Sequence, residues 1–171
     1  MRRKVKEASR STIRTVDDAL RACEAGRHRA GFRALLRLGE SGDEQAYHML
    51  GYLYDVGRGT RRSRAKAMLW YLKSYRTGNS SSASNIATMF RDSGKARLEF
   101  EWYRRAAALS DGDASLEIAI RYLSGKGVRR SLQSAVRELE RVLQTKHTSQ
   151  EARDTARQLL WGCRRGSARR A

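Results

Sequence analysis

The chain has 171 residues, and its 36 Lys and Arg residues outnumber 18 Asp and Glu residues, which leaves a formal net charge of +18. That length is enough to bury a hydrophobic core, and no apolar stretch approaches the ~18 residues that a membrane-spanning helix needs. Hydrophobic residues make up 40% of the chain, which excludes an obviously disordered one. We therefore expect a folded, strongly basic protein with no membrane partner.

The basic residues are concentrated at the two ends. Residues 1–14 contain six Lys or Arg and one Glu, and residues 162–171 contain four Arg. Segments this polar do not fold alone. We expect three parts: a basic N-terminal arm at 1–15, a helical body at 16–162 and a basic C-terminal tail at 163–171.

The two cysteines, Cys23 and Cys163, are 140 positions apart. This spacing fits neither a disulfide framework nor a zinc site, so the expected setting is a reducing one, the cytoplasm. Cys23 lies among small apolar residues and is expected to be a core residue. No metal ligand set is predicted.

Within the body, apolar residues recur at intervals of three and four, as in Ala30, Ala34 and Leu38. This periodicity, with many Ala, Leu, Arg and Glu residues, predicts an all-α fold. Nine helices are expected in chain order, at about 16–25, 29–40, 43–56, 63–77, 80–92, 96–110, 113–124, 131–145 and 149–162.

The predicted helices form pairs, and the pairs repeat. A shift of 68 residues aligns Leu50 with Ile118, Tyr54 with Tyr122, and the two Gly-x-Gly turns that follow them. A middle copy lies at a shift of 36, so the period averages 34 residues. Periods of this size are typical of helix-pair solenoids.

Each repeated residue type has a physical role. Small residues at 51, 87 and 119 allow close helix packing, and the aromatic residues at 54, 90 and 122 fill the space one turn later. The glycines permit the chain to reverse. Ser63 and Ser131 are placed to cap the next helix.

The repeated unit resembles the Sel-one-like repeat, a relative of the tetratricopeptide repeats. The resemblance rests on Ala46-x3-Leu50-Gly51-x2-Tyr54-x2-Gly57-x-Gly59, followed by Ala67-x2-Trp70-Tyr71. It is strongest over 42–78, and the copy at 112–145 has Glu138 where Trp is expected. The resemblance implies a short right-handed α-solenoid of about four helix pairs. It also implies a protein-binding adaptor or scaffold, often bacterial.

The first predicted function is therefore protein binding, as an adaptor, an inhibitor or an immunity-type protein. Its partner is expected to be acidic, because complementary charge favours encounter. The first helix of each pair should line a groove, so residues between its core positions are the candidates for contact, although Tyr47 and Tyr52 are equally interpreted as edges of the core. These groove candidates are Tyr47, His48, Tyr52, Asp55, Ser84, Thr88, Arg91, Ser115, Glu117 and Arg121.

The second predicted function is RNA or ribosome binding. Basic residues crowd the two Gly-x-Gly turns, which should lie on the same edge of a solenoid and follow a phosphate backbone. We call them the basic-turn residues: Arg58, Arg61, Arg62 and Arg64 with Lys66 in one turn, and Lys126, Arg129 and Arg130 in the other. No recognisable nucleic-acid motif accompanies them.

An enzyme is not expected. His28, His48 and His147 fall in different predicted elements, with no carboxylate at a shared spacing. Gly57-x-Gly59 lacks the preceding strand and the third glycine of a dinucleotide-binding loop. The sequence predicts no catalytic residue, no cofactor and no small-molecule substrate.

Overall fold

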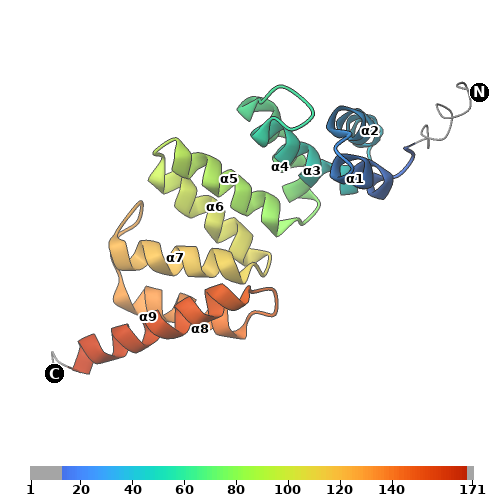
Figure 1. Cartoon of the computed structure of the whole chain (residues 1–171). Helices are drawn as coiled ribbons and strands as arrows, with labels where there is room; N and C mark the ends of the chain where they lie inside the picture. Colours follow the sequence, from blue (N-terminus) through green and yellow to red (C-terminus); the bar gives the residue numbers. More distant parts are fainter. Residues whose placement is uncertain (1–12, 169–171) are drawn as a thin grey trace, which may run out of the picture. The chain divides into compact units, whose positions relative to one another are not determined.

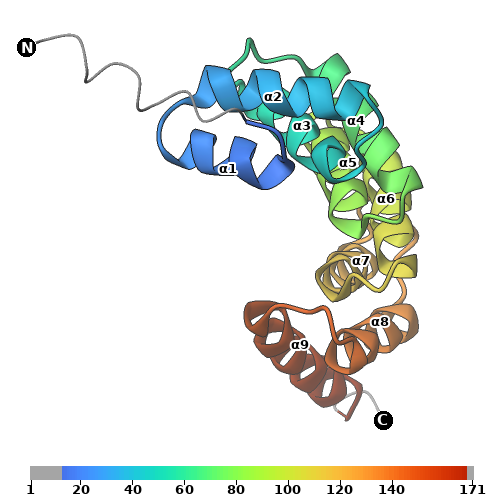
Figure 2. The ribbon, with the colours of Figure 1, turned by 90° about the vertical axis from the view of Figure 1, so that its right-hand side faces the viewer.

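The computed structural model describes residues 13–168, and within them it contains nine α-helices and no other regular element (Figure 1; Figure 2). Their bounds are α1 (Val16–Glu24), α2 (His28–Glu40), α3 (Gln45–Val56), α4 (Arg64–Arg76), α5 (Ser80–Asp92), α6 (Ala96–Ala108), α7 (Gly112–Ser124), α8 (Leu132–Gln144) and α9 (Gln150–Ala168). The predicted all-helical class and the number of helices are confirmed. Helix α9 runs six residues past the end expected for the helical body.

Polar residues just before the helices fix where several of them begin. Thr15 accepts a hydrogen bond from the Asp18 amide in a complete capping box, and Asn79 accepts one from the Ser82 amide. The Ser131 hydroxyl accepts from the Ser134 amide at 3.2 Å. The expected Ser131 cap is thus present, since such side chains satisfy amides that have no partner inside the helix.

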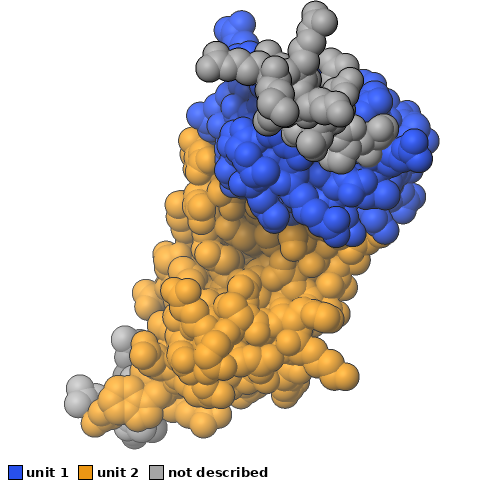
Figure 3. Space-filling view, turned by 45° about the vertical axis from the view of Figure 1, so that its right-hand side comes forward, with its two compact units in different colours: residues 1–74 blue, residues 75–171 orange. Residues whose placement is uncertain are grey.

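The chain divides into two compact units, unit 1 up to Ser74 and unit 2 from Tyr75 onward (Figure 3). The sequence did not predict this division, because the repeats continue across it. Each unit is described by itself below. In the described part of the chain, no helix combines the length and the apolar character needed to cross a bilayer.

In unit 1, close packing depends on two glycines. A Cβ atom at Gly31 of α2 would lie 2.3 Å from the Cys23 Sγ of α1. A Cβ atom at Gly51 of α3 would lie 2.4 Å from Cδ1 of the buried Tyr71 in α4. Both glycines therefore let neighbouring helices approach to a distance that a side chain would prevent.

In unit 2, successive helices from α5 to α9 pack against one another in chain order. Its last core cluster joins α7, α8 and α9 through Ala119, Leu139, Val142, Ala152, Ala156 and Leu160. Leu139 and Val142 are fully buried. The face of α8 that carries these apolar residues, three positions apart, is thus the face that enters this core.

The same aromatic pair occurs in both units. The Phe32 and Tyr54 rings of unit 1 meet edge to face with centroids 5.1 Å apart. The Phe100 and Tyr122 rings of unit 2 do the same at 5.4 Å. The two pairs are related by a shift of 68 residues, which confirms the register predicted from the sequence repeat.

The second glycine of each Gly-x-Gly turn packs against an equivalent backbone carbonyl in its own unit. A Cβ atom at Gly59 would lie 2.4 Å from the His28 carbonyl oxygen, and one at Gly127 would lie 2.3 Å from the Ala96 carbonyl oxygen. Both glycines have φ near +78°, at +79° and +77°. The turn after the first helix of a pair therefore rests on the start of the preceding helix, and only glycine fits there.

Candidate binding surfaces

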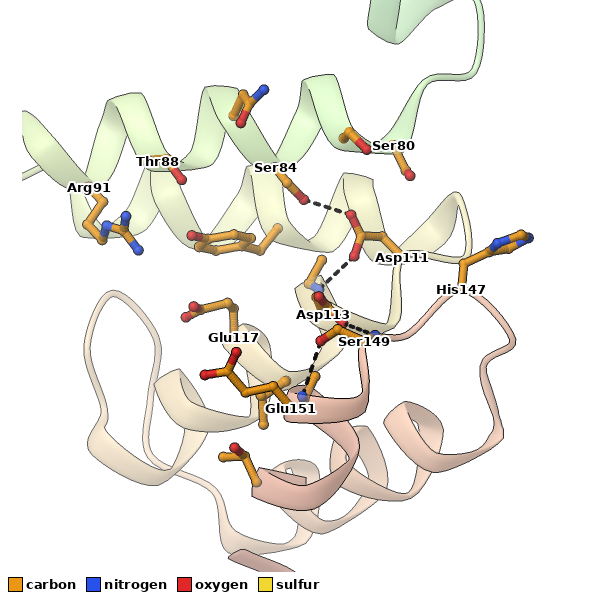
Figure 4. A pocket seen from close by; sticks show the side chains of 17 residues that line it. Ser80, Ser84, Thr88, Arg91, Asp111, Asp113, Glu117, His147, Ser149 and Glu151 are labelled. Atoms are coloured by element: carbon orange, nitrogen blue, oxygen red, sulfur yellow. Dashed lines mark hydrogen bonds between the residues drawn. The ribbon is translucent and has the colours of Figure 1, made fainter. Parts of the chain in front are cut away.

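Unit 2 contains an open groove of about 620 Å³ between α5, α7 and the start of α9 (Figure 4). Ser84 and Thr88 line it from α5. The Ser84 hydroxyl donates to Asp111 Oδ2 at 2.9 Å, and Asp111 Oδ1 accepts from the Ala114 amide at 2.9 Å. One carboxylate therefore caps α7 and also links α7 to α5.

The loop between α8 and α9 forms the end wall of this groove. The Gly112 amide donates to the His147 carbonyl at 2.9 Å, and the Ser149 amide donates to Asp113 Oδ1 at 2.8 Å. A Cβ atom at Gly112 would lie 1.8 Å from the Thr148 Oγ1. The loop is thus held tightly against the start of α7, and His147 and Ser149 line the groove.

The groove is acidic although the whole chain is strongly basic. Among the described residues, Asp111, Asp113, Glu117 and Glu151 line it together with one arginine, Arg91, and Glu117 is also paired with Arg121. Figure 4 shows Arg91 and Thr88 on α5 and Glu117 on α7, on the opposite side of the hollow. Low-dielectric walls strengthen the field of such a set, so the groove favours a cationic or neutral segment.

Beneath the groove lies a buried ion pair between Arg121 of α7 and Glu99 of α6. Arg121 also pairs with Glu117, and its guanidinium lies 5.1 Å from the centre of the Tyr103 ring. Burial works to lower the pKa of Arg121, but the hydrogen bond that Arg121 donates to Glu99 and the charge of Glu117 outweigh it and raise that pKa. Burial raises the pKa of Tyr103, which lines the groove.

Unit 1 contains a second open pocket, of about 790 Å³, where the start of α2 meets the turn between α3 and α4. Arg27, Arg29, Arg33 and Arg61 line it together with His28, and within the described residues no Asp or Glu does so. We call it the arginine pocket. Its electrostatic character is the opposite of that of the groove in unit 2.

The structure places four of the ten groove candidates, Ser84, Thr88, Arg91 and Glu117, in the lining of the unit 2 groove. Two others were expected to face a partner and are instead buried: Ser115 is 1% exposed and Arg121 is 6% exposed. The structure thus corrects the expectation that these two side chains face a partner. Arg121 is held inside because it compensates the charge of Glu99.

The remaining four groove candidates lie on α3 in unit 1. Tyr47 and His48 are half-buried, and their rings pack 5.6 Å from Trp70 and 5.9 Å from Tyr71 of α4. Tyr52 is 41% exposed, and Asp55 is half-buried, with its backbone carbonyl bound by Arg62 Nε at 2.7 Å. Tyr47 therefore fits the interpretation as a core edge better than Tyr52 does.

The basic-turn residues are exposed except for Arg64, which is half-buried. The two turns belong to different units. Arg58 donates to His28 Nε2 at 3.4 Å, and Lys66 lies 5.4 Å from the centre of the Tyr54 ring. That both turns follow a single phosphate backbone stays a prediction.

Sequence reasoning missed residues at both surfaces. Asp111 and Asp113 were interpreted only as an inter-repeat turn, and the loop at 145–149 received no role. In unit 1, three arginines at the start of α2, at positions 27, 29 and 33, were counted as part of the helical body. A signal did exist for them, because Arg27-His28-Arg29 precedes the first apolar turn of α2 directly.

The fold and these surfaces define a class: a helical repeat protein whose helix pairs present concave, polar binding surfaces. A profile of the Sel1 repeat matches residues 44–79, 100–111 and 112–137. The turns and aromatic pairs described above lie largely in these matched segments. These segments of the chain are therefore Sel1 repeats, and repeats of this type build protein-interaction modules that are usually non-catalytic.

Two solved bacterial structures share this fold. One is a Sel1 repeat protein from Oxalobacter formigenes, with a TM-score of 0.70 and 21% identity over 81% of this chain and 58% of that one. The other is c5321, a protective antigen of uropathogenic Escherichia coli, with a TM-score of 0.62 and 24% identity over 75% of this chain and 30% of that one.

A curated relative is the ERAD-associated E3 ubiquitin-protein ligase component HRD3B of Arabidopsis thaliana. It is 32% identical over 120 residues, which is 69% of this chain. The chain spans about a fifth of that relative's length, 19%. The similarity therefore concerns a set of repeats and not the whole plant protein.

Proposed function

We propose that this chain is a non-catalytic protein-binding module, of the adaptor, inhibitor or immunity type, and that its unit 2 groove receives a segment of the partner. The groove carries this proposal. It is open, it lies between the first helices of two successive pairs, and its walls are fixed by the hydrogen bonds of Asp111 and Asp113. A preformed groove costs little to order on binding.

The groove also constrains the chemistry of the partner. The net charge of +18 favours an acidic protein in long-range encounter. The four carboxylates of the groove favour a segment with Lys, Arg or neutral polar side chains at the point of contact. We therefore propose an acidic partner that inserts a locally basic or neutral segment. The two free cysteines and the bacterial structures support a cytoplasmic, bacterial setting.

The test is capture of a partner with two matched variants. Asn85→Trp adds a bulky ring to the groove wall, and Gln133→Trp adds the same ring to the exposed surface of α8. We expect one protein, retained in about equimolar amount by the wild type and by Gln133→Trp, to be lost with Asn85→Trp. Equal retention by both variants would place the contact outside the groove.

RNA binding is the second candidate, and the exposed arginines of the two Gly-x-Gly turns favour it. Phosphate contacts release counterions, so retention would fall steeply between low salt and roughly 0.5 M salt. Replacing Arg61, Arg62, Arg129 and Arg130 with Gln should then abolish retention of RNA. Retention of RNA at high salt, or by the fourfold variant, would contradict this candidate.

A further inference from the structure

We propose that the arginine pocket of unit 1 binds a phosphate monoester carried by a side chain of the protein partner. The proposal rests on the protein-binding function proposed above and adds a second site, of opposite charge to the groove.

The positive charge of the arginine pocket has no carboxylate to compensate it. Four arginines, Arg27, Arg29, Arg33 and Arg61, line one pocket, and within the described residues none of them forms an ion pair with a carboxylate. Gathering four cations in one concave surface is unfavourable unless an anion neutralises them. Arg guanidinium groups match phosphate oxygens with two parallel hydrogen bonds, which is why they recognise that group so often.

The start of α2 adds to the positive potential of the arginine pocket. The N-cap residue Arg27 makes no side-chain capping hydrogen bond, and of the first-turn amides of α2 the Ala30 amide donates to the Arg27 carbonyl at 3.0 Å. The helix dipole places partial positive charge at the same end. His28, whose Nε2 accepts from Arg58, carries its proton on Nδ1, and that buried atom has no acceptor among the described residues. The arginines that line the pocket therefore lie beside a helix start that also carries partial positive charge, and an anion would offset both.

The equivalent position in unit 2 does not carry the same set of positive charges. Lys95 occupies the position of Arg27, Arg97 that of Arg29, and Arg129 that of Arg61, because Gly127 rests on Ala96 as Gly59 rests on His28. At the position of Arg33, however, unit 2 has Glu101, which pairs with Arg104 at 3.4 Å. The excess of positive charge is thus a property of unit 1 and not of the repeat.

A phosphate monoester fits this pocket better than a nucleic-acid backbone. The monoester concentrates nearly two charges on one group, whereas a backbone diester carries one charge per nucleotide and is met by basic residues spread along a track. The four arginines instead line one pocket, between the start of α2 and the turn that precedes α4. No Phe, Tyr or Trp lines the pocket in the described part of unit 1, so no ring is offered for base stacking.

The experiment titrates the full chain with three probes at constant ionic strength: inorganic phosphate, a phosphoserine peptide, and the same peptide with Asp in place of phosphoserine. The pocket variant is Arg29→Gln with Arg61→Gln. Its charge-matched control is Arg97→Gln with Arg129→Gln, the same two positions in unit 2. Thermal unfolding of both variants checks that they are folded, and all four arginines are exposed.

We expect the phosphopeptide to bind at least about tenfold more tightly than the Asp peptide, and the pocket variant to lose about tenfold or more in affinity, as expected when charge-assisted hydrogen bonds are removed. The control should change by less than about twofold. Inorganic phosphate should compete with the phosphopeptide. Arg33→Glu, which copies unit 2, should abolish binding.

Three results would overturn the proposal. Equal losses in the pocket variant and the control would show general attraction to a basic protein. Equal binding of the phosphoserine and Asp peptides would remove the specificity for phosphate. A single-stranded RNA that binds more tightly than the phosphopeptide and depends on Arg29 and Arg61 would make nucleic acid the ligand. Asn85→Trp must leave phosphopeptide binding unchanged, so this test can fail or succeed independently of the groove in unit 2.

Discussion

The carboxylate of Glu99 is fully buried in unit 2 and is neutralised by the guanidinium of Arg121, whose side chain is 7% exposed. A buried pair of this kind adds little stability compared with apolar residues of similar size. Breaking it by removing one partner is costly, because the remaining charge then has no compensation. The pair also ties α6 to α7 directly below the groove.

We therefore predict that Arg121→Met lowers the free energy of unfolding by about 3–5 kcal/mol, because it leaves Glu99 buried and unpaired. The double variant Glu99→Leu with Arg121→Met should recover most of that loss. Urea denaturation of the wild type, both single variants and the double variant measures this coupling. Additive effects of the two substitutions would show that the pair does not act as a unit.

Two glycines inside helices should respond to alanine in opposite ways: one substitution should lower the stability and the other should raise it. Gly51→Ala places a Cβ atom 2.4 Å from the ring of the buried Tyr71, and we expect it to cost about 1–3 kcal/mol. Gly162→Ala in α9 meets nothing within 4 Å, and we expect a gain of about 0.5–1 kcal/mol from helix propensity. Thermal unfolding distinguishes them. A stable Gly51→Ala variant would contradict the close packing of α3 on α4.

Two tryptophans test burial in the same way. Trp102 is 8% exposed and meets the Tyr75 ring edge to face at 5.3 Å. We expect Trp102→Ala to cost about 3–5 kcal/mol. Trp161 is 63% exposed, and Trp161→Ala should change stability by less than about 0.5 kcal/mol. Chemical denaturation followed by far-UV circular dichroism measures both, and equal stability of the two variants would contradict the repeat register.

The half-buried ring of His48 should make the stability of the protein depend on pH. Burial lowers the pKa of His48 from its ordinary value of 6.5. The unfolded chain therefore binds this proton more readily than the folded one, so stability falls as the pH drops through about 6.5 toward the lower folded pKa. Between pH 7.5 and pH 5, the melting temperature of the wild type should fall more than that of His48→Gln. An identical pH profile for the two proteins would exclude His48 as the cause.

The repeat frame was predictable because its residues are fixed by local geometry. Gly59 has a positive φ and a close backbone neighbour, and Ser131 caps the start of a helix. Each of these positions favours a particular residue type, and that residue type therefore recurs in the sequence at a regular spacing. The aromatic partner of Tyr54 was not evident, because Phe32 comes from the preceding helix pair. Contacts of that kind appear only when the pairs are packed.

The binding surfaces were less predictable than the fold. Counting positions between core residues placed Arg121 on the surface, but the count cannot detect Glu99, a buried carboxylate on the neighbouring helix. The net charge of the chain did not indicate the charge of either surface. A total of +18 says nothing about how charge is divided locally, so neither the acidic groove of unit 2 nor the arginine pocket of unit 1 followed from it.

The boundary between the two units lies within α4, and this matters when the protein is cut into fragments. Its residues up to Ser74 count with unit 1, but its last turn carries Tyr75, whose ring packs on Trp102 of unit 2. A C-terminal fragment that begins at Tyr75 would keep this ring next to Trp102 but would lack the preceding turns of α4, which hold Tyr75 in a helix. Separate halves should therefore be cut so that the C-terminal fragment begins before Tyr75 and carries a complete turn of α4 with it.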